Sequence, residues 1–343
     1  MSSRAPVVVA EVSANHQGSL RKALALVEAV AQTGVSSIKF QTYTADTMTI
    51  DIDAPQFRID DDHGLWGGRS LYSLYEQAHT PWEWHAELFA ESRRLGLTPF
   101  SSPFDPSAVE FLETLEPALY KVASLEIGDI QLIRRIAQTG RPMVMSTGTA
   151  TLDELDDAVS TAQDTGCEDL TLLLCTSAYP ASAVDAHLAR MATLRERYGL
   201  PVGLSDHSKG NVVSIAAVAL GAVMIERHVT MNRAEGGPDA AFSLEPDELR
   251  RLVVDVGNCH HAVGSSRWRT VDAEDTSRQL KRSLYITADC APGDILTPHN
   301  VRSIRPSGGL APKYYDQVLG RRLVVAAPRG TPLSLDMLDF EVP

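Results

Sequence analysis

Short runs of apolar and β-branched residues recur eight times between positions 7 and 230. Runs of this length are typical of parallel strands that are buried on both faces. Most of the segments between them are amphipathic and helix-like, such as 19–34, which ends on a glycine in a C-terminal capping position. The eight runs are residues 7–13, 37–43, 97–104, 119–124, 142–147, 170–177, 202–208 and 223–230.

This alternation of strands and helices predicts an α/β protein with a (β/α)8 TIM barrel. A doubly wound open sheet is the structural alternative. It is disfavoured because no G-x-G-x-x-G turn follows the first apolar run.

The residue composition of the chain changes after the last helical segment. Residues 263–282 are polar and charged, as in a linker, and residues 283–343 contain short strand-like runs between Pro and Gly turns. We therefore expect a catalytic barrel over 1–262, a linker over 263–282 and a small β-rich domain over 283–343. The long segment 44–96 predicts a hairpin or flap together with a helix.

Charge and cysteine content restrict the partners and the compartment. The formal net charge of −13 argues against a nucleic-acid partner or an anionic membrane surface. The four cysteines form no C-x-x-C pair, as expected in a reducing compartment. The sequence shows no signal peptide and no apolar run near the roughly 18 residues of a membrane helix. We therefore expect a cytoplasmic protein.

Two lysines stand inside apolar runs. Charged residues are rarely buried without a partner, so Lys39 and Lys121 are expected to face the barrel mouth, where active sites of this fold lie. Lysine binds phosphate as a point charge. The two residues predict an anion site. Alternatively, each lysine pairs with a barrel carboxylate such as Glu126 or Glu226.

Two histidines end the seventh and eighth runs and should be neighbours on adjacent strands. Converging imidazoles such as His207 and His228 can bind a divalent metal and leave positions open for water and substrate. Either one could instead be a hydrogen-bonded core residue or a phosphate donor. A closed structural zinc site is not expected, because no cysteine or third ligand is evident.

Motifs at these strand ends resemble, in order, those of the sialic acid synthase family, and most closely its pseudaminic acid synthase branch. The resemblance covers almost the whole chain, and SIRP (303–306) is similar to part of the antifreeze-like SAF domain that these synthases carry. The barrel motifs are AEVSANHQGS (10–19), IKFQTY (38–43), SSPFD (101–105), YKVASLE (120–126), MSTG (145–148), CTSAYP (175–180), GLSDHS (203–208) and IERHVT (225–230), followed by GGPDAAFSLEPDEL (236–249).

The resemblance implies condensation of phosphoenolpyruvate with an open-chain N-acetylated amino sugar. The products would be phosphate and a nine-carbon 2-keto-3-deoxy (nonulosonic) acid. His207 and His228 would bind Mn²⁺ or Mg²⁺, and Glu126 would act near the metal-bound water, with Lys121 completing the catalytic set. The residues implied to hold phosphoenolpyruvate are Lys39, Ser102, Lys121, Ser124, Ser146 and Ser205. Those implied to contact the sugar are Glu11, Gln41, Ser177, Tyr179, Asp239 and Arg305. Arg305 would reach the barrel of the partner subunit in a domain-swapped homodimer.

One departure from the family pattern bears on the substrate. Ser177 stands where sialic acid synthases proper carry an asparagine, which favours the pseudaminic branch. N-acetylneuraminate and legionaminic acid synthases are the alternatives within the family. A metal-dependent aldolase or isomerase, and a carbohydrate- or ice-binding scaffold, are alternatives outside it. The inward lysines argue against both, because neither needs a site for a triply charged anion.

An aromatic stretch over 65–85 could supply apolar surface for the substrate. A 6-deoxy-2,4-diacetamido hexose would present a methyl and two acetamido groups to such a surface. Packing of a helix onto the barrel explains the same residues, which are Trp66, Tyr72, Tyr75, Trp82 and Trp84.

Overall fold

The computed structural model of the chain describes residues 5–60 and 66–339. The chain divides into two compact units, Met1–Gly264 and Ser265–Pro343. Part of the predicted flap, at 61–65, lies outside the described residues, as do the ends at 1–4 and 340–343.

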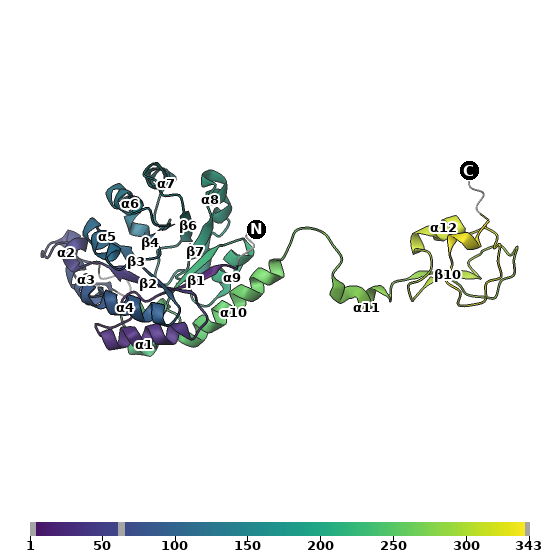
Figure 1. The fold of residues 1–343 in the computed structure, drawn as a ribbon, viewed down its shortest axis with the longest axis horizontal. Helices are drawn as coiled ribbons and strands as arrows, with labels where there is room; N and C mark the ends of the chain where they lie inside the picture. The colour runs from purple at the N-terminus through teal and green to yellow at the C-terminus, as the bar shows by residue number, and fades with distance from the viewer. Residues whose placement is uncertain (1–4, 61–65, 340–343) are drawn as a thin grey trace. The chain divides into compact units, whose positions relative to one another are not determined.

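The first unit is a closed barrel of eight parallel strands, which confirms the predicted (β/α)8 fold (Figure 1). Each strand pairs with its neighbours in sequence. The ring closes where β1 pairs with β8, Val7 opposite Met224 and Glu11 opposite His228. The strands are β1 (Val7–Glu11), β2 (Ser37–Thr42), β3 (Thr98–Pro103), β4 (Tyr120–Val122), β5 (Met143–Ser146), β6 (Leu170–Cys175), β7 (Val202–Ser205) and β8 (Met224–His228).

Helices surround the strands (Figure 1), and apolar residues of these helices are buried in one core with those of the strands. In the first helix, the buried residues Ala23, Leu26 and Val30 recur at helical spacing, and the Ser19 side chain caps its first turn. The helices of this unit are α1 (Leu20–Ala31), α2 (Ala45–Met48), α3 (Leu71–Ala78), α4 (Trp82–Arg94), α5 (Pro106–Glu113), α6 (Ile130–Ala137), α7 (Leu152–Asp164), α8 (Arg190–Tyr198), α9 (Val212–Ala219) and α10 (Pro246–Val263).

The main apolar core lies between the strands and the helices. Phe40, Phe100, Leu172 and Ile225 are each 0% exposed within it. The polar residues that close the strands are therefore left to the barrel interior and its rim. Among the helices described, none is long and apolar enough to span a membrane.

The long connection 44–96 differs from its prediction. Its described part contains three α-helices, α2, α3 and α4, where a hairpin or flap with one helix was expected. Within its described part, antiparallel pairing is confined to a single bridge between Arg58 and Ser70.

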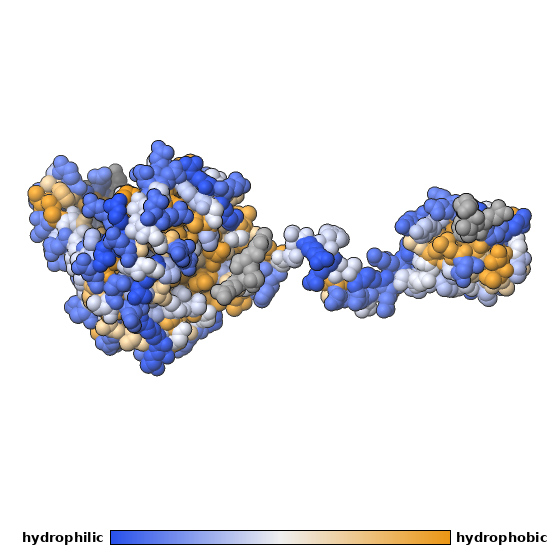
Figure 2. Space-filling view, turned by 45° about the horizontal axis from the view of Figure 1, so that its top comes forward, coloured by the Kyte–Doolittle hydropathy of each residue, from blue (hydrophilic) through white to orange (hydrophobic). Residues whose placement is uncertain are grey.

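The second unit has its own small core around a two-stranded antiparallel sheet. β9 (Ser283–Ile286) pairs with β10 (Val301–Ile304), and Leu284, Val318 and Leu333 are buried beside them. The range predicted as a linker holds the turns η7 (Asp272–Glu274) and α11 (Asp275–Arg278), and α12 (Tyr315–Val318) follows later in the unit. The hydropathy view in Figure 2 shows an apolar area on this unit.

A glycine in β7 allows two strands to approach closely, which yields a stability prediction. A Cβ on Gly203 would lie 2.4 Å from the backbone oxygen of Met224 and 2.7 Å from Leu173 Cδ2. Gly203→Ala should therefore lower the free energy of unfolding by about 1–3 kcal/mol in urea denaturation, the usual range for overpacking. The control is Gly257→Ala in α10, where a Cβ meets nothing within 4 Å. This substitution should stabilise the helix by up to about 1 kcal/mol. Equal effects of the two changes would contradict this account.

Candidate active site

A cavity of about 490 Å³ opens at the C-terminal ends of the barrel strands, where sites of this fold lie. Most of the residues predicted from the sequence line it. They are Lys39, Gln41, Lys121, Ser124, Glu126, Ser146, Tyr179, Ser205, His207, His228 and Asp239. Residues that lie between positions 39 and 239 in the sequence therefore line one cavity.

Lys39 belongs to a buried ion-pair network. Its Nζ lies 2.7 Å from Glu11 Oε2 and 3.6 Å from Glu226 Oε1, and it donates to Ser102 Oγ at 3.2 Å. Burial opposes the charge of Lys39, but the two carboxylates outweigh this effect and raise its pKa. For Lys39, therefore, the structure shows the ion pairing that was the alternative to an anion site.

Lys121 has a different environment. Its side chain is buried and lines the cavity, and its Nζ donates to the backbone carbonyl of Val122 at 2.9 Å. Among residues 5–60 and 66–339, no carboxylate lies within 4.0 Å of this ammonium. Burial lowers the pKa of Lys121. An ammonium has three N–H donors, and the Val122 carbonyl accepts from one of them. A bound anion would accept hydrogen bonds from the other two.

Hydroxyl groups surround the same part of the cavity. Ser146 Oγ is buried and has no hydrogen-bond partner in the described part of the chain, while Ser205 donates to Glu226 Oε1 at 3.2 Å. Gly148 keeps the space open, because a Cβ there would lie 2.3 Å from Ser177 Oγ and 2.7 Å from Ser124 Oγ. These hydroxyls can add neutral hydrogen bonds to an anion held by Lys121.

The two predicted histidines meet in the cavity, with ring centroids 5.2 Å apart. His207 Nδ1 lies 3.1 Å from the Thr176 carbonyl oxygen, which fixes the tautomer that leaves Nε2 available. His228 Nδ1 is buried, has no hydrogen-bond partner among the described residues and lies 4.0 Å from Asp239 Oδ2. Burial, with the charge of His207, lowers the pKa of His228 well below its usual range. His228 is therefore neutral, the form that binds a metal.

This donor set fits a metal ion that keeps open coordination positions. In the described ranges, no three or more His, Cys, Asp or Glu side chains are grouped so that they could hold a metal. A closed structural zinc site needs four protein ligands. Two imidazoles leave the remaining positions to water and substrate.

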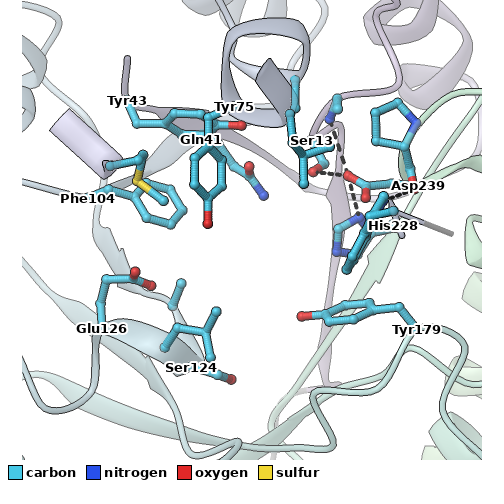
Figure 3. A pocket seen from close by; sticks show the side chains of 18 of the residues that line it. Ser13, Gln41, Tyr43, Tyr75, Phe104, Ser124, Glu126, Tyr179, His228 and Asp239 are labelled. Atoms are coloured by element: carbon cyan, nitrogen blue, oxygen red, sulfur yellow. Dashed lines mark hydrogen bonds and ion pairs between the residues drawn. The ribbon is translucent and has the colours of Figure 1, made fainter. Parts of the chain in front are cut away.

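Glu126 lies in the turn η3 (Ser124–Glu126) that follows β4. Burial raises its pKa to about 7, and the nearby charge of Lys121 only partly opposes this shift. Its Oε2 is buried and has no hydrogen-bond partner in the part of the chain described. Figure 3 shows the carboxyl group at the edge of the cavity. A carboxyl group with a near-neutral pKa can accept and return a proton.

Ser13 lines the cavity and was not among the residues predicted from the sequence. Its Oγ donates to Asp239 Oδ2 at 2.5 Å, and Figure 3 shows both side chains beside His228. Burial raises the pKa of Asp239, and the hydrogen bond from Ser13 opposes this shift. Ser13 lies inside the first motif, but its partner is 226 positions away. Only the motif could have drawn attention to it.

Aromatic rings wall the side of the cavity that lies away from Asp239 in Figure 3. The ring centroid of Tyr43 is 5.9 Å from that of Tyr75 and 5.1 Å from that of Phe104. The Tyr75 hydroxyl points into the cavity (Figure 3). This wall therefore combines apolar surface with a hydroxyl group that faces the cavity.

Of the residues in the aromatic stretch, Trp66 and Tyr75 line the cavity, where they could meet a substrate. The three others lie outside the lining. Trp82 stacks on a phenylalanine ring at 4.8 Å, Trp84 packs edge-on against a histidine, and the Tyr72 hydroxyl donates to a carboxylate of α2. The two tryptophans belong to α4, whose packing onto the barrel explains them.

Trp66, in the loop after β2, contacts two other loops at the cavity mouth. Its Nε1 donates to the Pro238 carbonyl oxygen at 3.0 Å, and its ring centroid lies 5.5 Å from that of Tyr179. The loops after β2, β6 and β8 therefore meet at this side chain.

Four predicted residues do not line the cavity. Glu11 is fully buried beneath the lining, and Ser102 accepts the hydrogen bond from Lys39. Ser177 Oγ lies 3.8 Å from the thiol sulfur of Cys175. Arg305 belongs to the second unit. The lining residues that were not predicted as site residues include Ser13, Tyr43, Met48, Phe104, Cys175 and Glu226.

Comparisons with known proteins agree with this geometry. A model of the NeuB family matches residues 26–267, and a model of the SAF domain matches residues 281–339. The barrel and the C-terminal unit therefore each match a separate family model.

Individual relatives match over nearly the full length. The chain is 40% identical to a pseudaminic acid synthase from Helicobacter pylori, covering 97% of this chain and 98% of that protein. It is 32% identical to an N,N'-diacetyllegionaminic acid synthase from Legionella pneumophila, over 98% of this chain and 96% of that protein. A solved N-acetylneuraminic acid synthetase from Leptospira borgpetersenii is similar with a TM-score of 0.71 at 30% identity, covering 79% of this chain and 90% of that one. The chain belongs to the NeuB family of enzymes.

Proposed function

We propose that the protein condenses phosphoenolpyruvate with an open-chain acetamido sugar, releasing phosphate and a nonulosonic acid. The observation that carries the proposal is Lys121, a buried ammonium that faces the cavity with one backbone acceptor and no ion-pair partner in the described chain. Such a group favours a multiply charged anion. The names of the relatives point to pseudaminic acid as the product.

The anion would lie at the lysine side of the cavity. Lys121 would supply charge, and the hydroxyls of Ser124, Ser146 and Ser205 would supply neutral donors. Lys39 is already paired with Glu11 and Glu226. It would therefore contribute less net charge to the anion than Lys121.

The sugar would lie between the two contrasting walls. Asp239, held by Ser13, can accept hydrogen bonds from hydroxyl or amide groups. Tyr43, Phe104 and Tyr75 on the other wall would pack against a deoxy methyl or acetamido methyl, and the Tyr75 hydroxyl could meet an amide. This division supports a 6-deoxy-2,4-diacetamido hexose over N-acetylmannosamine.

His207 and His228 would hold a divalent cation, Mn²⁺ or Mg²⁺. When bound, the cation would polarise the aldehyde of the open-chain sugar as a Lewis acid. The neutral state of His228 prepares that imidazole for this role. The pKa of His207 is raised, because burial, which lowers it, is outweighed by the contact with Cys175, so His207 would have to lose its proton when the cation binds.

The protein side chains would guide each bond change. C3 of phosphoenolpyruvate attacks the aldehyde carbon, and positive charge develops at C2. Glu126 accepts a proton from the water that adds to C2 and passes it to the alkoxide that the former aldehyde oxygen has become. The C2–O bond to phosphate then breaks, and the hydroxyl on C2 gives its proton to the departing phosphate, leaving the 2-keto group. Lys121 stabilises the phosphate throughout by charge that is already in place.

Phosphate release from phosphoenolpyruvate tests the proposal directly. Candidate hexosamines would be compared at equal concentration, with and without exhaustive chelation. The 6-deoxy-2,4-diacetamido hexose should give the highest kcat/KM, and chelation should abolish turnover. A preference for N-acetylmannosamine would reject the proposed sugar. Absence of phosphate release with every sugar would reject phosphoenolpyruvate itself.

Lys121→Ala should weaken phosphoenolpyruvate binding about ten- to a hundredfold. A hydrogen bond to a charged group contributes about 1.5–3 kcal/mol. Titration calorimetry provides the measurement, and Lys22→Ala is the control because Lys22 pairs with the exposed Glu235. Unchanged affinity in Lys121→Ala would make this lysine a structural residue.

The raised pKa of Glu126 predicts an acidic limb in the pH profile. If its ionised form accepts the proton, kcat/KM should fall about tenfold per pH unit as the pH drops below about 7, where the carboxyl becomes protonated. Lys121, Asp129 and Tyr75 are the other titratable groups that interact with it. Glu126→Gln should reduce kcat about a hundredfold or more and remove this limb. A limb that persists unchanged in Glu126→Gln belongs to another group.

We further propose a homodimer in which the C-terminal unit of each subunit covers the partner's barrel. Arg305 is exposed and has no carboxylate partner within the described residues 265–339. Val324, Val325 and Leu335 expose apolar surface on the same unit. Residues 1–264 carry a net charge of −15 and residues 265–343 a net charge of +2, from 20 and 11 basic against 35 and 9 acidic residues. Opposite charge favours such docking.

Complementation tests this arrangement. An Arg305→Ala chain mixed with a His207→Ala chain should regain activity after subunit exchange, because each crossed heterodimer contains one intact site. A mixture of His207→Ala and Lys121→Ala chains is the control, since both lesions lie in the barrel. Verified exchange without recovery in the first mixture would exclude the crossover.

A further inference from the structure

A buried ion pair lies directly behind the two histidines. Asp206 precedes His207 and Arg227 precedes His228. Successive residues of a strand point to opposite faces. His207 and His228 line the main cavity, and Arg227 contacts Ser214 of α9 on the outer face of the barrel.

The guanidinium of Arg227 holds the backbone that follows His207. Its Nη1 donates to Asp206 Oδ2 at 2.7 Å and to the Gly210 carbonyl oxygen at 2.8 Å, while Nη2 donates to the Ser208 carbonyl oxygen at 2.7 Å. The side chain is 0% exposed. One planar group therefore fixes three acceptors on the loop after β7 from a position in β8.

Asp206 completes the network from the other side. Its Oδ1 accepts from the Ser208 backbone N–H at 2.8 Å, and its Oδ2 accepts from Ser214 Oγ at 2.5 Å. Its own backbone N–H donates to the Glu226 carbonyl oxygen at 3.0 Å. His207 is thus flanked by two residues whose positions are both fixed by Arg227.

Packing alone does not require charges at these positions. A buried ion pair can often be replaced by apolar residues of similar volume without loss of stability. What an apolar pair cannot supply is the fixed direction of several hydrogen bonds to one loop. The separation of the two imidazoles depends on the relation between that loop and β8.

We infer that Asp206 and Arg227 are a positioning pair that sets the geometry of His207 and His228 for metal binding. The inference rests on the proposed function, because it assumes that the two imidazoles bind a divalent cation. Neither Asp206 nor Arg227 would contact the cation, because Arg227 lies on the outer face of the barrel and Asp206 is paired with it. They act through the histidine backbones.

Manganese affinity of the full chain, measured by titration calorimetry with Mn²⁺ alone, tests the inference. Arg227→Lys keeps the charge but loses the planar fork, and should weaken Mn²⁺ binding about ten- to a hundredfold, as for groups that orient ligands. Arg141→Lys is the matched control. Arg141 spans Glu113 and the Pro117 carbonyl oxygen, away from the histidines, so its loss should lower Tm and leave Mn²⁺ affinity unchanged.

An apolar double variant separates positioning from stability. Asp206→Leu combined with Arg227→Met removes both charges and keeps similar volume, so Tm should recover relative to the single changes. The inference expects Mn²⁺ affinity to stay weak in this variant. Recovery of both Tm and affinity would show that the pair only packs, and would overturn the inference.

His207→Ala distinguishes failure of the inference from failure of the proposed metal site. Wild-type protein that does not bind Mn²⁺, or His207→Ala protein that binds as tightly as wild type, would overturn both. Loss of binding in His207→Ala together with wild-type affinity in Arg227→Lys would overturn the positioning pair alone.

Discussion

The pairing of β1 with β8 is the constraint on which the rest of the molecule depends. Five residue pairs, from Val7 opposite Met224 to Glu11 opposite His228, close the ring. A closed barrel has no free strand edge, so all eight carboxyl ends surround one opening. Lys39 of β2 pairs with one carboxylate from each strand of this closure, Glu11 of β1 and Glu226 of β8. The strands that close the barrel therefore also supply the carboxylates that pair with Lys39 inside it.

The cavity is asymmetric in charge as well as in shape. Lys39 is compensated by Glu11 and Glu226, whereas Lys121 has a backbone carbonyl as its acceptor. Two lysines with similar sequence surroundings therefore have different electrostatic states. The difference arises from which strand neighbours each one in the ring, and it gives the site a preferred place for negative charge.

The strands and the strand-end residues could be predicted from the sequence because a two-sided buried strand has a strong local pattern. Lys121, His207 and His228 were found in this way, and all three line the cavity. The pairing of Ser13 with Asp239 could not be predicted, since it joins residues 226 positions apart. The sequence could not decide between substrate surface and helix packing for Trp82 and Trp84, because aromatic content does not reveal which side of a helix faces the barrel; the structure shows packing. For Arg305, sequence resemblance remains the basis of the proposed role.

The lack of an ion-pair partner for Lys121 among the described residues also affects the stability of the folded protein. A buried cation without a counterion makes the empty folded state less favourable than the same state with an anion in place. Under the proposed function, an anion that binds beside Lys121 would stabilise the fold by mass action, by about 2.7 kcal/mol when its concentration is a hundred times its Kd. The resistance of the enzyme to heat would then vary with the anions in solution, including those that take no part in any reaction.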